Sequence, residues 1–436
     1  MEHLQAHGLV VGDEIGQIKK INLQKGEVTP LTLASNEPLH FSKCITSISP
    51  LNLNGQNTSF LVSNISRSLF FYDSITDEIR QIEHSLDCFD SPLIGSRCID
   101  DQNVALGFKN GAIYKMNLSN VLYLNKLSLK ALNLLGVESP PPKRSRRIHL
   151  NPSKNANNCE ENKNEAIKIF EPKWNGDTVY MTCFNVNKNR LAVGGFNAEM
   201  KIFDINTGQN IFSPKGKADN WFLPNREIWI SGIEWIDNEY DTNMISTCSR
   251  TQPYVRIFDL RQRKAIIEID LTPYNNANNE SNMPSLTSLC STTSVTNFNG
   301  TSLIVGTTLG RMVAVDLRMQ NHTSKVLGGF KDFSGGSIRD IKCVRNGKTS
   351  LKIISCSLDR FVRVHNLTKT NRLLDKKFYM KTKPTCIQPI LSRIQTSKSS
   401  TKCHSDDKND EQRNEDNDKK DDDEGGYGDN DDDEFY

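Results

Sequence analysis

The most regular pattern of hydrophobic and polar positions runs from Gly335 to Leu367. Three short segments there, residues 338–343, 352–356 and 361–365, mix apolar and polar residues in an approximate alternation, and polar turns separate them. Alternation with a period of two predicts half-buried strands, and three such strands joined by turns predict an antiparallel meander. One meander of this size cannot bury its own faces, so we expect it to recur as stacked sheets.

The meander does recur, and the end of its third strand marks each copy. Seven alternating runs close on a pair whose second residue is Asp or Asn, a degenerate form of the Trp-Asp pair that marks WD-repeat blades. A hairpin precedes each pair, and most of these hairpins contain a run ending in Gly or Ser, which suits a strand packed near a central channel. The pairs are Ile21-Asn22, Tyr72-Asp73, Met116-Asn117, Phe203-Asp204, Phe258-Asp259, Val315-Asp316 and His365-Asn366.

The innermost strands give a third signal, because the sequence contains seven candidates for them. The last candidate follows the final hairpin, whereas the first hairpin, residues 9–23, has no such strand before it. We therefore predict an all-β fold over residues 1–391, a seven-bladed WD40-like β-propeller closed by the N-terminal hairpin together with the C-terminal strand. The candidate innermost strands are residues 44–49, 96–100, 179–184, 230–235, 286–290, 338–343 and 385–390.

Two polar segments depart from this pattern. A long gap begins with apolar residues 121–135, expected to form an outer strand, and continues at about 136–170 as a basic and polar insertion expected to be disordered. Residues 392–436 are predicted to form a disordered acidic tail. Residues 404–436 hold 16 acidic and 4 basic residues, a balance of −12, and because the chain carries +2, residues 1–403 carry +14. A basic body is typical of proteins with phosphate-rich partners, although a solvated surface has the same composition.

Four basic residues follow three prolines inside the insertion: Lys143, Arg144, Arg146 and Arg147. A basic cluster on an extended segment is typical of a nuclear-import signal, and we predict that role and a nuclear location. A non-specific RNA-binding patch and a plain charged loop are the alternatives.

The loop at residues 217–229 groups aromatic, amide and cationic side chains. Aromatic residues beside arginine are typical anchors of protein contacts. Trp221 is the stronger candidate, because Trp229 directly precedes a strand and can pack beneath it as core. The candidate contact residues of this loop are Lys217, Asn220, Trp221, Arg226 and Trp229.

The residue types of an active site do not come together in this sequence. The chain has no Gly-x-x-x-x-Gly-Lys-Ser/Thr, its 11 cysteines include no Cys-x-x-Cys, and its 8 histidines are scattered. Asp359 falls in a predicted turn, where a carboxylate usually accepts backbone hydrogen bonds. We expect no enzyme, no cofactor, no metal and no membrane span, and we expect the cysteines of the strands to be buried, reduced thiols.

The order of these segments resembles the WD repeat-containing protein 74 family of nucleolar large-subunit assembly factors. Two features differ from that family: the loop lacks an acidic residue after Asn220 and a proline before Ile228, and the tail is acidic rather than lysine-rich. The resembling segments are residues 9–24, 194–204, 217–229, 254–259, 305–318, 336–343, 355–365 and 379–382.

This resemblance implies a non-catalytic scaffold in the nucleolus that acts in assembly of the 60S subunit and in pre-rRNA processing. It implies as partners the pre-60S ribosomal proteins and assembly factors, an AAA-type ATPase that releases the scaffold, the helicase of the RNA exosome, and pre-rRNA itself. The alternative is another nuclear WD-repeat scaffold, a ubiquitin-ligase substrate receptor or a chromatin reader. The resembling segments add four candidate contact residues, Arg256, Arg339, Arg360 and Arg363.

Overall fold

A computed structural model gives the fold of the protein. The chain divides into two units, residues 1–394 and 395–436, and the second lies outside the described residues. The described elements are strands β1–β30 and one 3-10 turn, η1 (Phe41–Lys43), and no helix in the described segments is long and apolar enough to cross a membrane. The described residues are 4–31, 38–53, 56–82, 91–119, 166–170, 173–174, 177–178, 180–215, 228–236, 243–271, 285–292, 302–317, 326–332, 335–346, 350–368 and 372–393.

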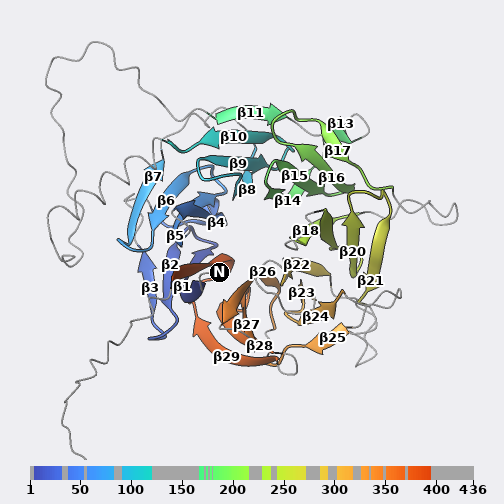
Figure 1. The fold of residues 1–436 in the computed structure, drawn as a ribbon. Coiled ribbons are helices and arrows are strands. Elements are labelled where there is room, and N and C mark those ends of the chain that lie inside the picture. Colours follow the sequence, from blue (N-terminus) through green and yellow to red (C-terminus); the bar gives the residue numbers. More distant parts are fainter. Residues whose placement is uncertain are drawn as a thin grey trace, which may run out of the picture. The chain divides into compact units, whose positions relative to one another are not determined.

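Seven antiparallel blades surround a central axis in residues 4–393, which confirms the predicted all-β propeller (Figure 1). From the axis outward, blade 1 is β30 (Pro384–Arg393), β1 (Leu4–Asp13), β2 (Ile18–Asn22) and β3 (Val28–Leu31). Blade 2 is β4 (Ile45–Leu53), β5 (Gln56–Asn64), β6 (Leu69–Asp73) and β7 (Glu78–Ile82), and blade 3 is β8 (Leu93–Cys98), β9 (Asn103–Phe108), β10 (Ile113–Asn117) and β11 (Ala166–Phe170).

The remaining four blades follow in chain order after a short hairpin, β12 (Lys173–Trp174) and β13 (Asp177–Thr178). Blade 4 is β14 (Met181–Asn187), β15 (Arg190–Gly195), β16 (Ala198–Asp204) and β17 (Asn210–Phe212), and blade 5 is β18 (Ile230–Ile236), β19 (Met244–Ser249), β20 (Tyr254–Asp259) and β21 (Ala265–Asp270). Blade 6 is β22 (Leu286–Ser291), β23 (Ser302–Thr307), β24 (Met312–Asp316) and β25 (Val326–Gly329), and blade 7 is β26 (Ile338–Asn346), β27 (Ser350–Ser357), β28 (Phe361–Leu367) and β29 (Arg372–Tyr379).

The residue pair that marks each repeat has a structural role at the end of the third strand. Its first member is buried, and Tyr72 and His365 are 0% exposed. In five of the seven pairs the second member holds the following turn: the Asp204 carboxylate, for example, accepts the N–H groups of Asn206 at 2.9 Å and Thr207 at 2.8 Å. A short polar side chain is favoured there because it reaches back to the backbone of its own turn. The same role is filled by Asn22, Asp73, Asn117 and Asp259.

The hydrophobic core lies between the blades rather than within them. Among the described residues, buried apolar side chains form seven clusters, and each cluster joins two neighbouring blades. The cluster between blades 7 and 1 includes Leu9, Val364 and Ile387, which are 0 to 1% exposed. The junction at the chain ends is therefore packed like the other six, and each blade buries its faces only against its neighbours.

Small residues at the ends of second strands let neighbouring blades approach closely. A Cβ atom added to Gly194 would lie 2.7 Å from Cγ2 of Ile230, and one added to Gly12 would lie 2.5 Å from Cγ2 of Ile45. Both isoleucines belong to the inner strand of the next blade. The expectation that these positions are crowded is confirmed, and the crowding comes from the adjacent blade.

The two chain ends build blade 1 together, as the sequence predicts. Strand β30 pairs with β1 in antiparallel register, from Leu4 opposite Arg393 to Asp13 opposite Pro384. The inner strand continues to Arg393, past the predicted end of the propeller at residue 391. A single bridge between Leu391 and Asn57 also connects blade 1 to blade 2.

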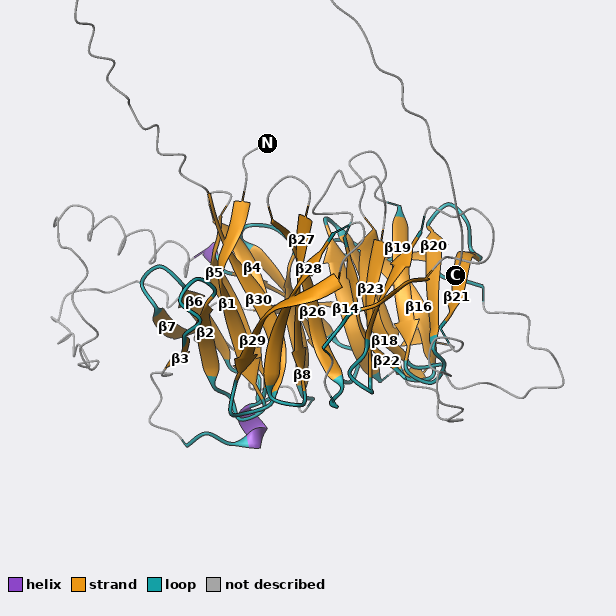
Figure 2. Ribbon diagram, turned by 90° about the horizontal axis from the view of Figure 1, so that it is seen from below, coloured by secondary structure: helices purple, strands orange, loops and turns teal. Residues whose placement is uncertain are grey.

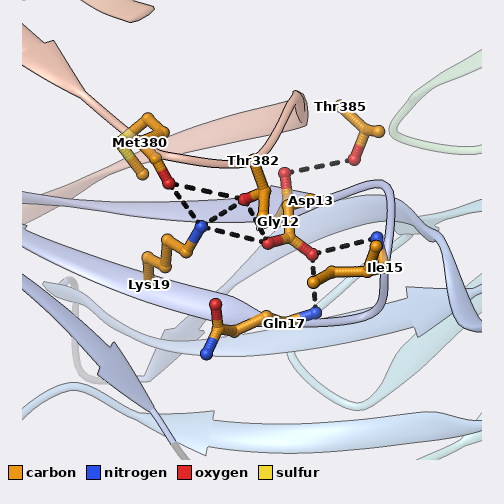
Figure 3. Close-up of polar contacts among 8 residues, drawn as sticks. All are labelled: Gly12, Asp13, Ile15, Gln17, Lys19, Met380, Thr382 and Thr385. Carbon is orange, nitrogen blue, oxygen red and sulfur yellow. Dashed lines mark hydrogen bonds and ion pairs between the residues drawn. The ribbon is translucent and has the colours of Figure 1, made fainter. Parts of the chain in front are cut away.

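A buried ion pair stabilises the closure of the ring in blade 1 (Figure 3). The Lys19 ammonium lies 3.1 Å from the Asp13 carboxylate, and the two side chains are 6% and 1% exposed. Lys19 also donates to the Met380 carbonyl at 2.7 Å, and the Thr382 hydroxyl donates to Asp13 at 2.6 Å. Two N–H groups of the turn after β1 donate to the same carboxylate at 3.2 and 2.7 Å. The pair thus ties the first hairpin to the segment that leads into β30.

Blade 3 differs from the sequence-based expectation at its outer strand. That strand is β11 (Ala166–Phe170), which pairs with β10, whereas residues 121–135, expected to supply it, lie outside the described residues. Strand β11 occupies the last part of the range at 136–170 that was expected to be disordered. The signal for it is the short Ile-Lys-Ile alternation at residues 167–169, which the polar sequence before it obscures.

Replacing Lys19 with alanine is expected to destabilise the propeller by about 3 kcal/mol, because it leaves the buried Asp13 carboxylate without its cation. The adjacent Lys20 provides the matched control. It pairs with Asp77 at 2.6 Å, but these side chains are 23% and 47% exposed, and Lys20→Ala should cost less than about 1 kcal/mol. Denaturant unfolding of both variants measures the difference, and equal losses would contradict the structural role given to the Asp13–Lys19 pair.

Candidate interaction site

The inner strands of the seven blades line a channel along the propeller axis. The channel has a volume of about 1460 Å³. Hydroxyl side chains connect neighbouring inner strands across the blade boundaries: Thr385 donates to the Ile45 carbonyl at 2.6 Å, and Ser231 donates to the Leu286 carbonyl at 2.8 Å. These bonds connect neighbouring blades at the wall of the channel.

One end of the channel is built by the same backbone hydrogen bond in every blade. The residue directly after the second strand donates its N–H to the carbonyl of the residue directly before the inner strand, at 2.8 to 3.0 Å. We call this end the rim face; η1 lies on it, at the bottom of Figure 2, and the first residues of β1 lie at the opposite face. The seven pairs, donor first, are Glu14–Lys383, Ile65–Cys44, Lys109–Pro92, Phe196–Tyr180, Arg250–Trp229, Thr308–Ser285 and Leu358–Ser337.

Aromatic and cationic side chains gather at the rim positions of blades 3, 4 and 5. We call Lys109, Tyr180, Phe196, Trp229 and Arg250 the aromatic–cationic arc. The Lys109 ammonium lies 4.6 Å from the ring centroid of Tyr180, and the Arg250 guanidinium lies 4.8 Å from that of Trp229. Phe196 meets Trp229 edge-on, with ring centroids 5.4 Å apart. Attraction between each cation and its ring holds the charged groups at the mouth of the channel.

The other blades carry different chemistry at the same backbone positions. In blade 1 the two rim residues, Glu14 and Lys383, form an ion pair of 3.3 Å with each other. Blade 6 places Thr308 and Ser285 there. The arc is therefore a local feature of three consecutive blades and not a consequence of the repeat itself.

Among the described residues, positive charge exceeds negative charge at the channel mouth. Lys109, Arg250 and Arg339 all line the channel, and none of them forms an ion pair with a carboxylate in the described part of the chain. By contrast, the Asp340 carboxylate next to Arg339 is paired with Lys342 at 3.2 Å. The mouth is thus complementary to an anionic group.

Glu234 lies deeper in the channel wall and titrates near neutrality. Burial raises the pKa of its carboxyl to about 7; the positive charges of Lys342 and Arg97 act against this rise, and the negative charge of Asp340 adds to it. Asn185 donates to the same carboxylate at 3.1 Å. The charge of the channel therefore changes by one near pH 7.

Several residues predicted from the sequence cannot be placed, because they lie outside the described residues. They are Lys217, Asn220, Trp221 and Arg226 of the loop, and Lys143, Arg144, Arg146 and Arg147 of the basic cluster.

Two predicted contact residues line the channel from different blades, and a third lies on the same face. Trp229 is half-buried and Arg339 is exposed, and both line the channel. Arg360 is exposed in the turn before β28, where its backbone has a φ of 69°. For Trp229, the structure gives a position against Arg250 at the mouth rather than beneath a strand.

The remaining two predicted contact residues form ion pairs within the propeller. Arg256 pairs with Glu199 at 2.7 Å and so joins blades 5 and 4. Arg363 is 4% exposed and pairs with Asp359 at 2.5 Å. Asp359 also accepts the N–H of Phe361 at 3.2 Å, which confirms that this carboxylate holds its turn. The five described candidates do not form one site, and Arg256 and Arg363 play no part in the contacts proposed below.

The sequence-based search missed four members of the arc: Lys109, Tyr180, Phe196 and Arg250. Their signal is positional, since each stands directly after a second strand or directly before an inner strand. Reading that signal requires the ends of both strands in every blade, and strand ends are the least certain feature of a sequence-based assignment.

The described cysteines and acidic residues give no sign of metal chemistry. Within the described ranges, no group of three or more His, Cys, Asp or Glu side chains is placed to hold a metal ion. The eight described cysteines are free thiols. Cys290, Cys356 and Cys386 are buried as expected, but Cys44, Cys183 and Cys343 are only half-buried, and the first two of these line the channel.

Comparison with known proteins finds a distant similarity. No protein-family model matches the chain. WD repeat-containing protein 74 of Homo sapiens is 26% identical over 200 residues, and that of Bos taurus is 26% identical over 201 residues. Each match covers 45% of this chain and 45% of the relative, so the chain spans about half the length of the curated relatives it matches. This confirms the predicted resemblance as a distant one.

A solved structure supports the fold alone. The crystal structure of the computationally designed protein Ika8 superimposes with a TM-score of 0.50 at 12% identity, covering 89% of this chain and 94% of the designed one. A β-propeller with WD-repeat relatives is typical of non-enzymatic scaffolds.

Replacing Glu234 with glutamine should flatten part of the pH dependence of stability. The carboxyl has a pKa of about 7 in the folded chain against an ordinary value of 4.5, so the folded state holds the proton more tightly and stability falls as pH rises between these values. The melting temperature of the wild type should therefore fall relative to that of Glu234→Gln from pH 4.5 to 7. The exposed Glu27→Gln is the control, and parallel melting curves for Glu234→Gln and wild type would contradict the assignment.

Proposed function

We propose that this chain is a non-catalytic WD-repeat scaffold that acts in nucleolar assembly of the large (60S) ribosomal subunit and in pre-rRNA processing. The observation that carries the scaffold role is the rim face, where a fixed backbone frame presents cations beside aromatic rings, and these cations have no carboxylate partner among the described residues. The ribosomal setting is supported by the distant similarity to WD repeat-containing protein 74.

The proposed mechanism is surface complementarity. A closed propeller holds its side chains in place before binding, so little ordering entropy is lost when a partner docks. Its partners are proposed to be pre-60S ribosomal proteins and assembly factors, with pre-rRNA attracted by the net charge of +14 on residues 1–403. We further propose that an AAA-type ATPase releases the chain from the particle, that the helicase of the RNA exosome is a neighbour there, and that Lys143, Arg144, Arg146 and Arg147 direct nuclear import.

A tagged full-length chain should sediment with precursors of the 60S range on a sucrose gradient. Because phosphate attraction contributes to the association, RNase or high salt should shift the chain toward the top of the gradient. The tag expressed alone is the control. Migration as a free protein, or in a complex of ubiquitin-ligase size that RNase leaves unchanged, would contradict the ribosomal assignment and favour another nuclear scaffold.

A further inference from the structure

We propose that the rim face docks a protein segment with acidic side chains at its centre and apolar side chains on either side, and that the acidic part lies at the aromatic–cationic arc. This names the chemistry of one partner of the proposed scaffold and rests on that scaffold role. It does not depend on the ribosomal setting.

Exposed hydrophobic side chains are concentrated on the rim face. Of the twelve large hydrophobic residues that are exposed in the described segments, seven lie in its loops and turns, and the other five are spread over outer strands and the opposite face. Exposed apolar groups gathered on one face mark a site of contact with another molecule. The seven are Leu39, Phe41, Ile65, Tyr180, Phe196, Leu309 and Leu358.

The charges of the same face select an acidic partner. Glu14 and Asp340, the carboxylates beside the channel mouth, are already paired with Lys383 and Lys342 at 3.3 and 3.2 Å. The cations of the mouth have no such partner among the described residues, as shown above. A carboxylate brought to them gains charge-assisted hydrogen bonds in a partly dehydrated setting.

The kind of apolar residue favours protein over RNA. Single-stranded RNA binds by stacking its bases on free aromatic faces. Of the described rings on this face, Tyr180 is covered by Lys109 and Trp229 by Arg250, and Phe196 meets Trp229 edge-on, which leaves Phe41 as the most exposed ring. The other exposed apolar residues of the face, Leu39, Ile65, Leu309 and Leu358, have no ring on which a base can stack. Aliphatic side chains around a charged centre are instead suited to the side chains of another polypeptide.

The arrangement also fits an extended segment. An extended peptide spans about 3.3 Å per residue, so a short segment can cross the channel mouth. Laid across it, the segment would place its centre near Lys109 and Arg250 and its ends near apolar residues such as Leu358, which is 37% exposed. The acidic and apolar residues of the partner are therefore expected to lie close together in its sequence.

Fluorescence anisotropy with the purified full-length chain tests this inference. The probe is a short labelled peptide with a central run of glutamates flanked by leucines; the comparisons are the same peptide with glutamines and an oligouridylate of equal length. The acidic peptide should bind about tenfold more tightly than the glutamine peptide, and Lys109→Glu/Arg250→Glu should remove about tenfold of its affinity. Lys25→Glu/Lys264→Glu, which changes the charge equally in exposed turns of the opposite face, should leave binding unchanged.

Three results would overturn the inference: no binding of the acidic peptide, equal binding of the acidic and glutamine peptides, or tighter binding of oligouridylate that the Lys109→Glu/Arg250→Glu variant abolishes. If charge reversal lowers the melting temperature, Lys109→Gln/Arg250→Gln replaces it. The assay contains no ribosomal particle, so its failure is distinguishable from a failure of the sedimentation experiment.

Discussion

The structure depends on one constraint: a four-stranded blade has two apolar faces and can bury them only against other blades. Seven clusters of buried side chains lie between the blades, and the ring must close for the seventh cluster, between blades 7 and 1, to exist. Closure is made by β30 pairing with β1 across the two ends of the sequence. The buried Asp13–Lys19 pair adds specificity at this point, since its cation also binds the backbone carbonyl of Met380, in the segment before β30.

Closure explains why the rim face can vary in chemistry without changing in shape. The hydrogen bond that builds the rim joins backbone atoms in all seven blades, so any side chain is allowed there. In blade 1 these positions hold the ion pair of Glu14 and Lys383, whose charges cancel, whereas in blades 3 to 5 they hold the aromatic–cationic arc. Function in such a fold is a property of the side chains placed on a common frame, and the arc is the clearest example in this chain.

The sequence predicts the architecture well because the architecture follows from two readable features: the alternation of apolar residues in each strand and the number of repeats. The pairing of residues 385–390 with the first hairpin follows from one hairpin lacking an inner strand and one strand lacking a hairpin. Strand β11 was missed because five residues of alternation stand beside a long polar stretch. Arg360 and Arg363 look alike in the sequence, yet one is exposed in a turn and the other is buried against Asp359. The contact of Lys109 with Tyr180 could not be predicted from the sequence, because it joins two blades that a long insertion separates in the chain.

Hydrogen–deuterium exchange of the full-length chain tests the central claim, closure of the ring by its two ends, most directly. Closure predicts that the amides of β1 and β30 exchange only through global unfolding, with protection equal to that of the inner strands β14 and β18. Their protection should be lost at the same denaturant concentration as that of the other blades. Exchange of residues 384–393 by local opening, while β14 and β18 stay protected, would contradict the account.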